Sequence, residues 1–85
     1  MKVTTKTGFE CEVDVTAFDD MECVELVARI DRGDKTAVPA FLMQLIGEEQ
    51  KLALYDHVRN EKGRVPIEAV MAEIEDILDG SGEKK

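Results

Sequence analysis

The chain has 85 residues, with 19 acidic and 11 basic side chains and a formal net charge of −8. This length fits one small domain and leaves little backbone for an enclosed catalytic cavity. The acidic balance argues against nucleic acid and anionic membranes as partners, because affinity for phosphate comes from Lys and Arg. A basic partner, or one with apolar surface to hide, fits better, although acidity can also serve solubility alone.

Cysteine content and hydropathy indicate the cellular compartment of the protein. Cys11 and Cys23 are too few for a disulfide framework, and the N-terminal segment lacks the apolar stretch of a signal peptide. No apolar run approaches the ~20 residues that span a bilayer. We therefore expect a cytoplasmic protein with two free thiols.

Residues 1–14 alternate apolar and polar side chains on both sides of Gly8, which is typical of a β-hairpin. A two-residue loop would pair Val3 with Glu12 and mix the two faces. A three-residue loop ending at Gly8 instead pairs Val3 with Cys11 and places the glycine where such loops need a left-handed residue. A hairpin alone is marginally stable, so its apolar face is expected to cover other elements.

Helical periodicity begins after the hairpin. The first helix is expected to start at Asp19 or Asp20, either of which can act as the N-cap, and to end near Asp31 before Gly33. Its predicted core stripe is Val24, Val27 and Ile30, with Cys23 and Leu26 beside it. A second, short helix is expected from Pro39 to Gly47, with a buried face of Phe41, Leu42, Leu45 and Ile46.

The C-terminal half predicts two more helices. One runs from about Glu48 to Asn60, with an apolar stripe of Leu52, Tyr55 and Val58. The other follows Pro66 and carries the clearest pattern: Ile67, Val70, Met71, Ile74, Ile77 and Leu78. The predicted fold is α+β, an N-terminal hairpin packed on about four short helices. Residues 1–79 form a single domain (hairpin 1–14, helical part 19–79), and 80–85 form a flexible polar tail.

Catalytic and metal-binding patterns are missing from the sequence. Nucleophilic catalysis needs a nucleophile, a base and an orienting group. The single histidine, His57, is expected on the solvated surface, and Cys11 lies in the alternating strand, where a small buried hydrophobe is expected. Neither Cys-x-x-Cys nor a histidine pair at i, i+4 occurs. We therefore expect no enzymatic activity, no metal and no cofactor.

Two sets of side chains are candidates for contact with a partner. The last helix carries carboxylates expected mainly on its solvated face, with contact to a basic partner as the alternative role: Glu68, Glu73, Glu75, Asp76 and Asp79. Four apolar residues lie off the predicted stripes and are the candidate partner-binding residues, with filling of core gaps as the alternative: Phe18, Met21, Met43 and Leu54.

Five short segments, in order, span nearly the whole chain outside the tail: KTGFECEV at 6–13, DME at 20–22, GEEQ at 47–50, LYDHVR at 54–59 and GRVP at 63–66. Their order and the total length resemble the tail-assembly chaperone family of long-tailed phages and prophages, chiefly of Gram-positive hosts. The resemblance implies a non-catalytic protein that binds the tape-measure protein, with the tail-tube protein as a second candidate partner. It also implies action in the bacterial cytoplasm and absence from the mature virion.

Two other classes of function stay open. One is a structural or connector subunit that remains in the phage particle. The other is an acidic inhibitor of a host protein that mimics DNA, which the net charge of −8 motivates. The sequence also leaves open whether the chain forms a homo-oligomer and which of its surfaces binds.

Overall fold

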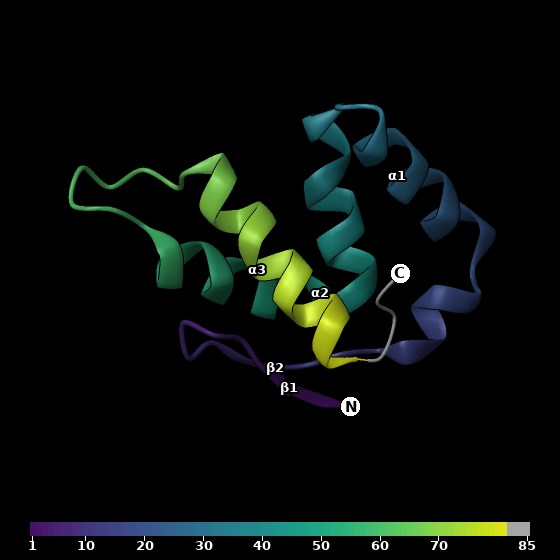
Figure 1. Cartoon of the computed structure of the whole chain (residues 1–85), viewed down its shortest axis with the longest axis horizontal. Helices are drawn as coiled ribbons and strands as arrows, with labels where there is room; N and C mark the ends of the chain where they lie inside the picture. The colour runs from purple at the N-terminus through teal and green to yellow at the C-terminus, as the bar shows by residue number, and fades with distance from the viewer. Residues whose placement is uncertain (82–85) are drawn as a thin grey trace.

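The computed structural model of the chain describes residues 1–81. Within this range a β-hairpin precedes three α-helices, as Figure 1 shows: β1 (Lys2–Thr4), β2 (Glu10–Glu12), α1 (Met21–Asp31), α2 (Val38–Val58) and α3 (Ile67–Gly80). Short 3-10 helices at Val15–Asp19 and Lys35–Ala37 lead into α1 and α2. The expected α+β architecture, a hairpin packed on a small helical bundle, is confirmed.

The register of the hairpin follows its side-chain pattern. Val3 pairs with Cys11, as predicted, and the backbone N–H of Thr5 donates to the carbonyl oxygen of Phe9 at 2.8 Å. Gly8 ends the three-residue loop with a φ of 95°, a conformation that glycine adopts without strain. The apolar face of the hairpin is buried against the helices, so both predictions about this element are confirmed.

Helix α2 is broken at Gly47, whose backbone has a φ of 82° and a ψ of 166°. Only glycine adopts this conformation readily, because a β-carbon would strain it. Figure 1 shows the two halves of α2 running in different directions. The two helices predicted on either side of Gly47 are therefore confirmed as the halves of α2, although the second half ends at Val58 rather than Asn60.

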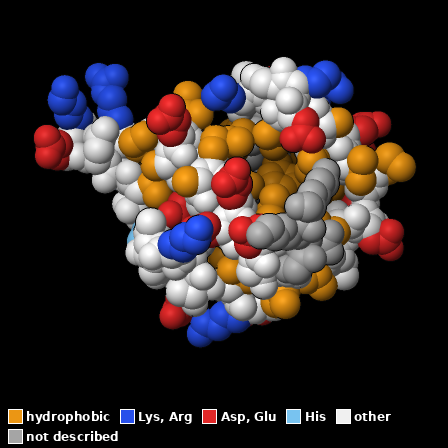
Figure 2. Space-filling view, in the orientation of Figure 1, with side chains coloured by type: hydrophobic (Ala, Val, Ile, Leu, Met, Phe, Trp, Pro, Cys, Tyr) orange, Lys and Arg blue, Asp and Glu red, His pale blue; other side chains and the backbone are white. Residues whose placement is uncertain are grey.

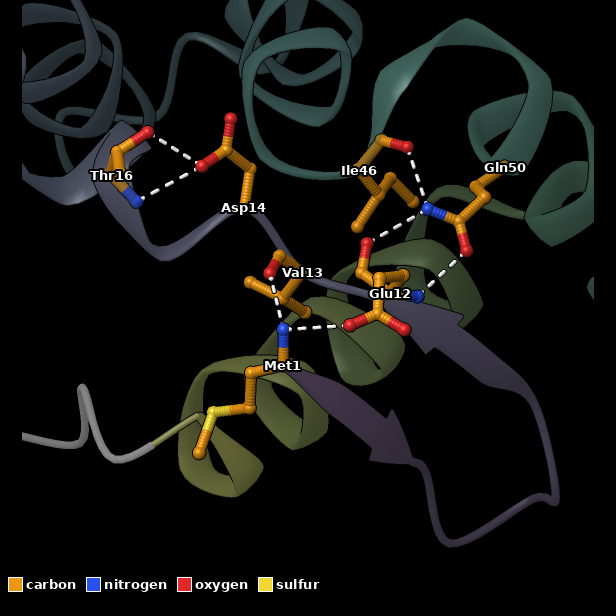
Figure 3. Close-up of polar contacts among 7 residues, drawn as sticks. All are labelled: Met1, Glu12, Val13, Asp14, Thr16, Ile46 and Gln50. Atoms are coloured by element: carbon orange, nitrogen blue, oxygen red, sulfur yellow. Dashed lines mark hydrogen bonds and ion pairs between the residues drawn. The ribbon is translucent and has the colours of Figure 1, made fainter.

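The break in α2 frees backbone carbonyls, which accept hydrogen bonds from Asp14 and from Gln50 of α2 itself. The Leu45 oxygen accepts from the Asp14 N–H at 3.0 Å, and the Ile46 oxygen accepts from Gln50 Nε2 at 2.7 Å. The Gln50 amide also accepts from the Glu12 N–H at 2.7 Å and donates to the Glu12 carbonyl at 2.8 Å (Figure 3). At Glu12 the outer edge of β2 is therefore paired, and the hairpin is fixed to α2.

One continuous core joins the hairpin to α2 and α3, and its fully buried side chains are Val13, Cys23, Phe41, Leu42, Leu45, Leu54 and Ile77. The predicted buried face of the first half of α2 is confirmed. In the second half the predicted stripe is wrong at Leu52, which is 49% exposed, because the bonds of Gln50 to β2 turn another face inward. That face carries Leu54, four residues after Gln50.

Two predictions about helix surfaces also need correction. On α1, Val24 is 50% exposed and only Cys23 is fully buried, whereas Val27 and Ile30 of the predicted core stripe are partly buried and line a groove. At the other end of the chain, α3 continues through Gly80, and Ser81 is buried, so the predicted tail does not begin at 80. Gly80 lies so close to β1 that an added β-carbon would be 2.7 Å from Val3 Cγ1. The rest of the predicted tail, 82–85, lies outside the described residues.

Candidate functional site

An open apolar groove separates α1 from α3. Over the residues that the structure describes, the backbones of these two helices do not contact one another, and the first half of α2 lies between them (Figure 1). The groove has a volume of about 450 Å³, and its apolar lining includes Val27, Ile30, Phe41, Met71, Ile74 and Leu78. Figure 2 shows it as a hollow with hydrophobic side chains at its base. The apolar stripes of α1 and α3 therefore face each other without meeting.

A second hollow of about 400 Å³ adjoins the groove where α3 begins. Its apolar lining comes from both halves of α2, from the loop before α3 and from α3: Val38, Pro39, Tyr55, Val65 and Val70. The two hollows share Lys35, Ile67 and Met71. Ile67 is 55% exposed at this junction, although the sequence predicted it to be buried. The two hollows together form one continuous apolar surface, of the kind that marks an interaction site.

Charged side chains line the same groove. Asp31, Glu68 and Glu75 contribute three carboxylates and Lys35 contributes one ammonium group, so these four side chains carry a net charge of −2. All four residues are exposed, and none forms an ion pair with another residue in the range 1–81. Carboxylates beside an apolar floor favour a ligand that is both apolar and cationic.

The four predicted partner-binding residues have different surroundings. Met21 is 70% exposed and Met43 is 42% exposed, so both remain accessible. Phe18 is partly buried and packs against the core. Leu54 has no exposed surface, so it has the alternative role of filling the core: it lies on the face of α2 that Gln50 turns inward. None of the four lines either hollow.

Sequence reasoning missed the groove because its residues carry an ordinary core pattern. Val27 and Ile30, like Met71 and Leu78, have the helical spacing of a buried stripe. Whether two stripes meet or stay apart depends on tertiary packing, which spacing does not encode. The only local signal is the charge of Glu68, Glu75 and their neighbours beside the stripe.

A hydrogen-bonded cluster ties the hairpin loop to α2 and α3. Thr7 Oγ1 donates to Glu73 Oε2 at 2.6 Å and lies 2.8 Å from His57 Nε2. The Thr7 hydroxyl has one proton, and it uses that proton in the hydrogen bond to Glu73. In the contact between Thr7 and His57 the hydroxyl oxygen therefore accepts, and His57 Nε2 is the donor. Glu73 is 2% exposed, and its Oε1 has no hydrogen-bond partner in the described part of the chain. The prediction of a solvated Glu73 is therefore wrong, because this face of α3 packs under the hairpin loop.

The environment of Cys11 does not favour a reactive thiol. Burial, followed by the negative charges of Glu12 and Glu73, raises the pKa of the Cys11 thiol. The protonated form is a weak nucleophile. Burial and the Asp20 carboxylate raise the pKa of Cys23 in the same direction. His57 hydrogen-bonds Thr7 in this arrangement.

Comparisons of the chain with protein families, with curated proteins and with solved structures found no match. Within residues 1–81, no group of three or more His, Cys, Asp or Glu side chains could hold a metal ion. In the same range, no helix is both long enough and apolar enough to cross a membrane. The groove and its charged rim are the surface feature on which a functional proposal can be built.

Proposed function

We propose that this chain is a non-catalytic tail-assembly chaperone of a long-tailed phage or prophage, and that it binds the tape-measure protein during tail morphogenesis. The observation that carries this proposal is the open apolar groove between α1 and α3. A small domain that leaves facing helical stripes unpaired has surface to offer to another protein. The client is named from the resemblance of the ordered sequence segments to the tail-assembly chaperone family.

The chemistry of the client supports the proposal. A tape-measure protein is long, helical and prone to aggregate, so before assembly it exposes apolar helix faces. An apolar groove between two helices can cover such a face. The net charge of −8 would keep the loaded complex dispersed, because like-charged particles repel.

Co-expression tests the proposal directly. The chain is produced together with a fragment of the tape-measure protein from the same phage genome, and the soluble share of that fragment is measured. We expect the soluble share to rise and the two proteins to purify together. A fragment that stays insoluble whether or not the chain is present would count against the chaperone function.

Mass spectrometry of purified virions separates the chaperone from a structural subunit. A chaperone acts in the cytoplasm and leaves before the particle is complete, so we expect no peptides of this chain in the virion. Peptides present in proportion to known tail proteins would favour the structural or connector function instead.

A further inference from the structure

We infer that the groove between α1 and α3 binds one amphipathic α-helix that carries Lys or Arg beside its apolar stripe, on the flank next to α3. The inference rests on the proposed function in one respect, namely that the occupant is a segment of a client protein. It goes further in naming the conformation and the charge of that segment.

The walls of the groove favour a helical occupant over an extended one. An extended peptide gains affinity mainly by adding main-chain hydrogen bonds to a sheet edge. Here the walls are α1 and α3, whose backbone groups bond within their own helices. An α-helix satisfies its own backbone and presents apolar anchors at i, i+3, i+4 and i+7, which suits a groove lined by side chains alone.

The rim determines the charge of the occupant. Asp31 lies at the end of α1, and Glu68 and Glu75 lie seven residues apart on α3. Residues at i and i+7 fall on the same side of a helix, so these two carboxylates follow one edge of the groove. A helix seated on the apolar floor would place its flanking side chains beside them, and a basic flank makes those contacts attractive.

The same charges disfavour a second copy of this chain as the occupant. Its amphipathic helices would bring their own carboxylates to the rim, among them Glu22 and Glu25 on α1 and Asp79 on α3. Like charges brought together at an interface are repulsive, and the net charge of −8 on each copy adds to the effect. A basic helix of another protein has no such conflict.

Synthetic peptides provide the first test. The probe is a helix of about 18 residues, long enough to form in isolation, with a leucine stripe and lysine flanks. Its matched control keeps the leucines and replaces lysine by glutamate. We expect the lysine peptide to bind at least roughly tenfold more tightly, with NMR shift changes centred on Val27, Met71 and Leu78. Equal affinity for both peptides, or shift changes centred elsewhere, would overturn the inference.

Substitution in the groove tests the apolar contact. Ile67→Gln removes an exposed apolar side chain that lines both hollows, and Leu52→Gln removes one of similar exposure that lines neither. Because Ile67 is about half exposed, its burial by the peptide should be worth roughly five- to tenfold in Kd. We expect Leu52→Gln to change Kd less than about twofold. Equal effects of the two substitutions would contradict binding in the groove.

A pair of double variants tests the rim. Glu68→Gln with Glu75→Gln neutralises two rim carboxylates, and Glu48→Gln with Glu49→Gln neutralises two exposed carboxylates elsewhere. We expect the rim pair to weaken lysine-peptide binding roughly three- to tenfold at low salt, with a smaller loss at high salt. The control pair should change the logarithm of Kd for the lysine peptide by less than about half as much as the rim pair does. Equal losses would mean attraction to net charge alone and would overturn the inference.

The tape-measure fragment then separates this inference from the proposed function. A triple variant combines Ile67→Gln, Glu68→Gln and Glu75→Gln, and its folding is checked by the NMR spectrum of the free protein. If wild type and the triple variant solubilise the fragment equally, the chaperone function stands and the groove inference fails. If the lysine peptide binds in the groove but the fragment stays insoluble, the inference stands and the proposed function fails.

Discussion

The hairpin side of the molecule and the groove side differ in how far their apolar side chains are covered by other elements. On the hairpin side, residues 1–14 are held to α2 and α3 by polar side chains with specific partners, chiefly Gln50 and Thr7. On the groove side, α1 and α3 face each other across apolar side chains that no element in the described range covers. Apolar stripes with the same 3.6-residue periodicity are thus buried in the core on the hairpin side and remain uncovered on the groove side.

This difference separates stability from binding within one small domain. A domain of this size has few apolar residues to spare, so surface left open reduces its own stability. The hairpin side compensates by burying Leu54 and Ile77 fully and by pairing the edge of β2. Substitutions on the hairpin side should therefore affect folding, and substitutions on the groove side should affect binding.

The largest contrast is expected between Leu54→Ala and Ile67→Ala. Leu54 has no exposed surface, so its truncation leaves a cavity and should cost about 2–5 kcal/mol of unfolding free energy. Ile67 is 55% exposed, and its truncation should change stability by less than about 0.5 kcal/mol. Urea denaturation followed by circular dichroism measures both. Similar losses at the two positions would break the distinction between the two sides.

A smaller loss is expected from Gly47→Ala, at the break in α2. An added β-carbon would meet no atom within 4 Å, so its effect comes from the backbone alone. With a φ of 82° and a ψ of 166°, alanine should cost about 1–3 kcal/mol. The exposed Gln44→Ala, one turn earlier in α2, is the control and should stay within about 0.5 kcal/mol. A neutral Gly47→Ala would mean that the break is not needed to place the hairpin.

The cluster under the hairpin loop should respond to Thr7→Val. Valine keeps the shape of threonine but cannot donate to Glu73, whose buried carboxylate would lose the one hydrogen bond that it makes within residues 1–81. We expect a loss of about 1–3 kcal/mol in urea denaturation, because an unpaired buried polar group is costly. Thr7→Ser retains the hydroxyl and should recover most of that stability. Equal losses for valine and serine would assign the effect to packing rather than to the hydrogen bond.

The hairpin register and several helix boundaries could be predicted because they depend on local chemistry. Val3 can pair favourably with Cys11 in one register, Gly33 and Gly47 end helices through positive φ, and Pro66 precedes the last helix. The burial of Glu73 could not be predicted, because an acidic residue at that spacing is normally solvated and its partner, Thr7, is 66 residues away.

The candidate site could not be predicted as a site, because its apolar residues have the spacing of a buried core and the four predicted partner-binding residues line neither hollow. The residues of the groove were recognised as apolar stripes, and Glu68 and Glu75 as an alternative contact for a basic partner. Which stripes stay uncovered depends on the direction that α2 takes at Gly47 and on where α3 then packs. Those are long-range relations, and helical spacing reports only the face of each helix.

The smallest expected effect concerns two aspartates with the same local role on opposite sides. Asp14 and Asp34 each cap a 3-10 helix and accept from the backbone and hydroxyl of the threonine two residues later. Hydrogen bonds from Thr16 hold the pKa of Asp14 below its usual value, and hydrogen bonds from Thr36, then from Arg29, do the same for Asp34.

Because these pKa values are lower in the folded state than in the unfolded state, both aspartates stabilise the fold above the unfolded pKa of about 3.9. That contribution should be lost as the pH falls through the folded pKa values. Asp14→Asn and Asp34→Asn should each cause a small loss near pH 7 that shrinks under acid, as measured by urea denaturation across pH. Equal losses of unfolding free energy would show that the Asp34 cap, on the groove side, stabilises the fold as much as the Asp14 cap does on the hairpin side. The groove would then be open because no element covers it in the described range, and not because its caps are weaker. A loss confined to Asp14→Asn would instead trace the difference between the two sides to the caps themselves.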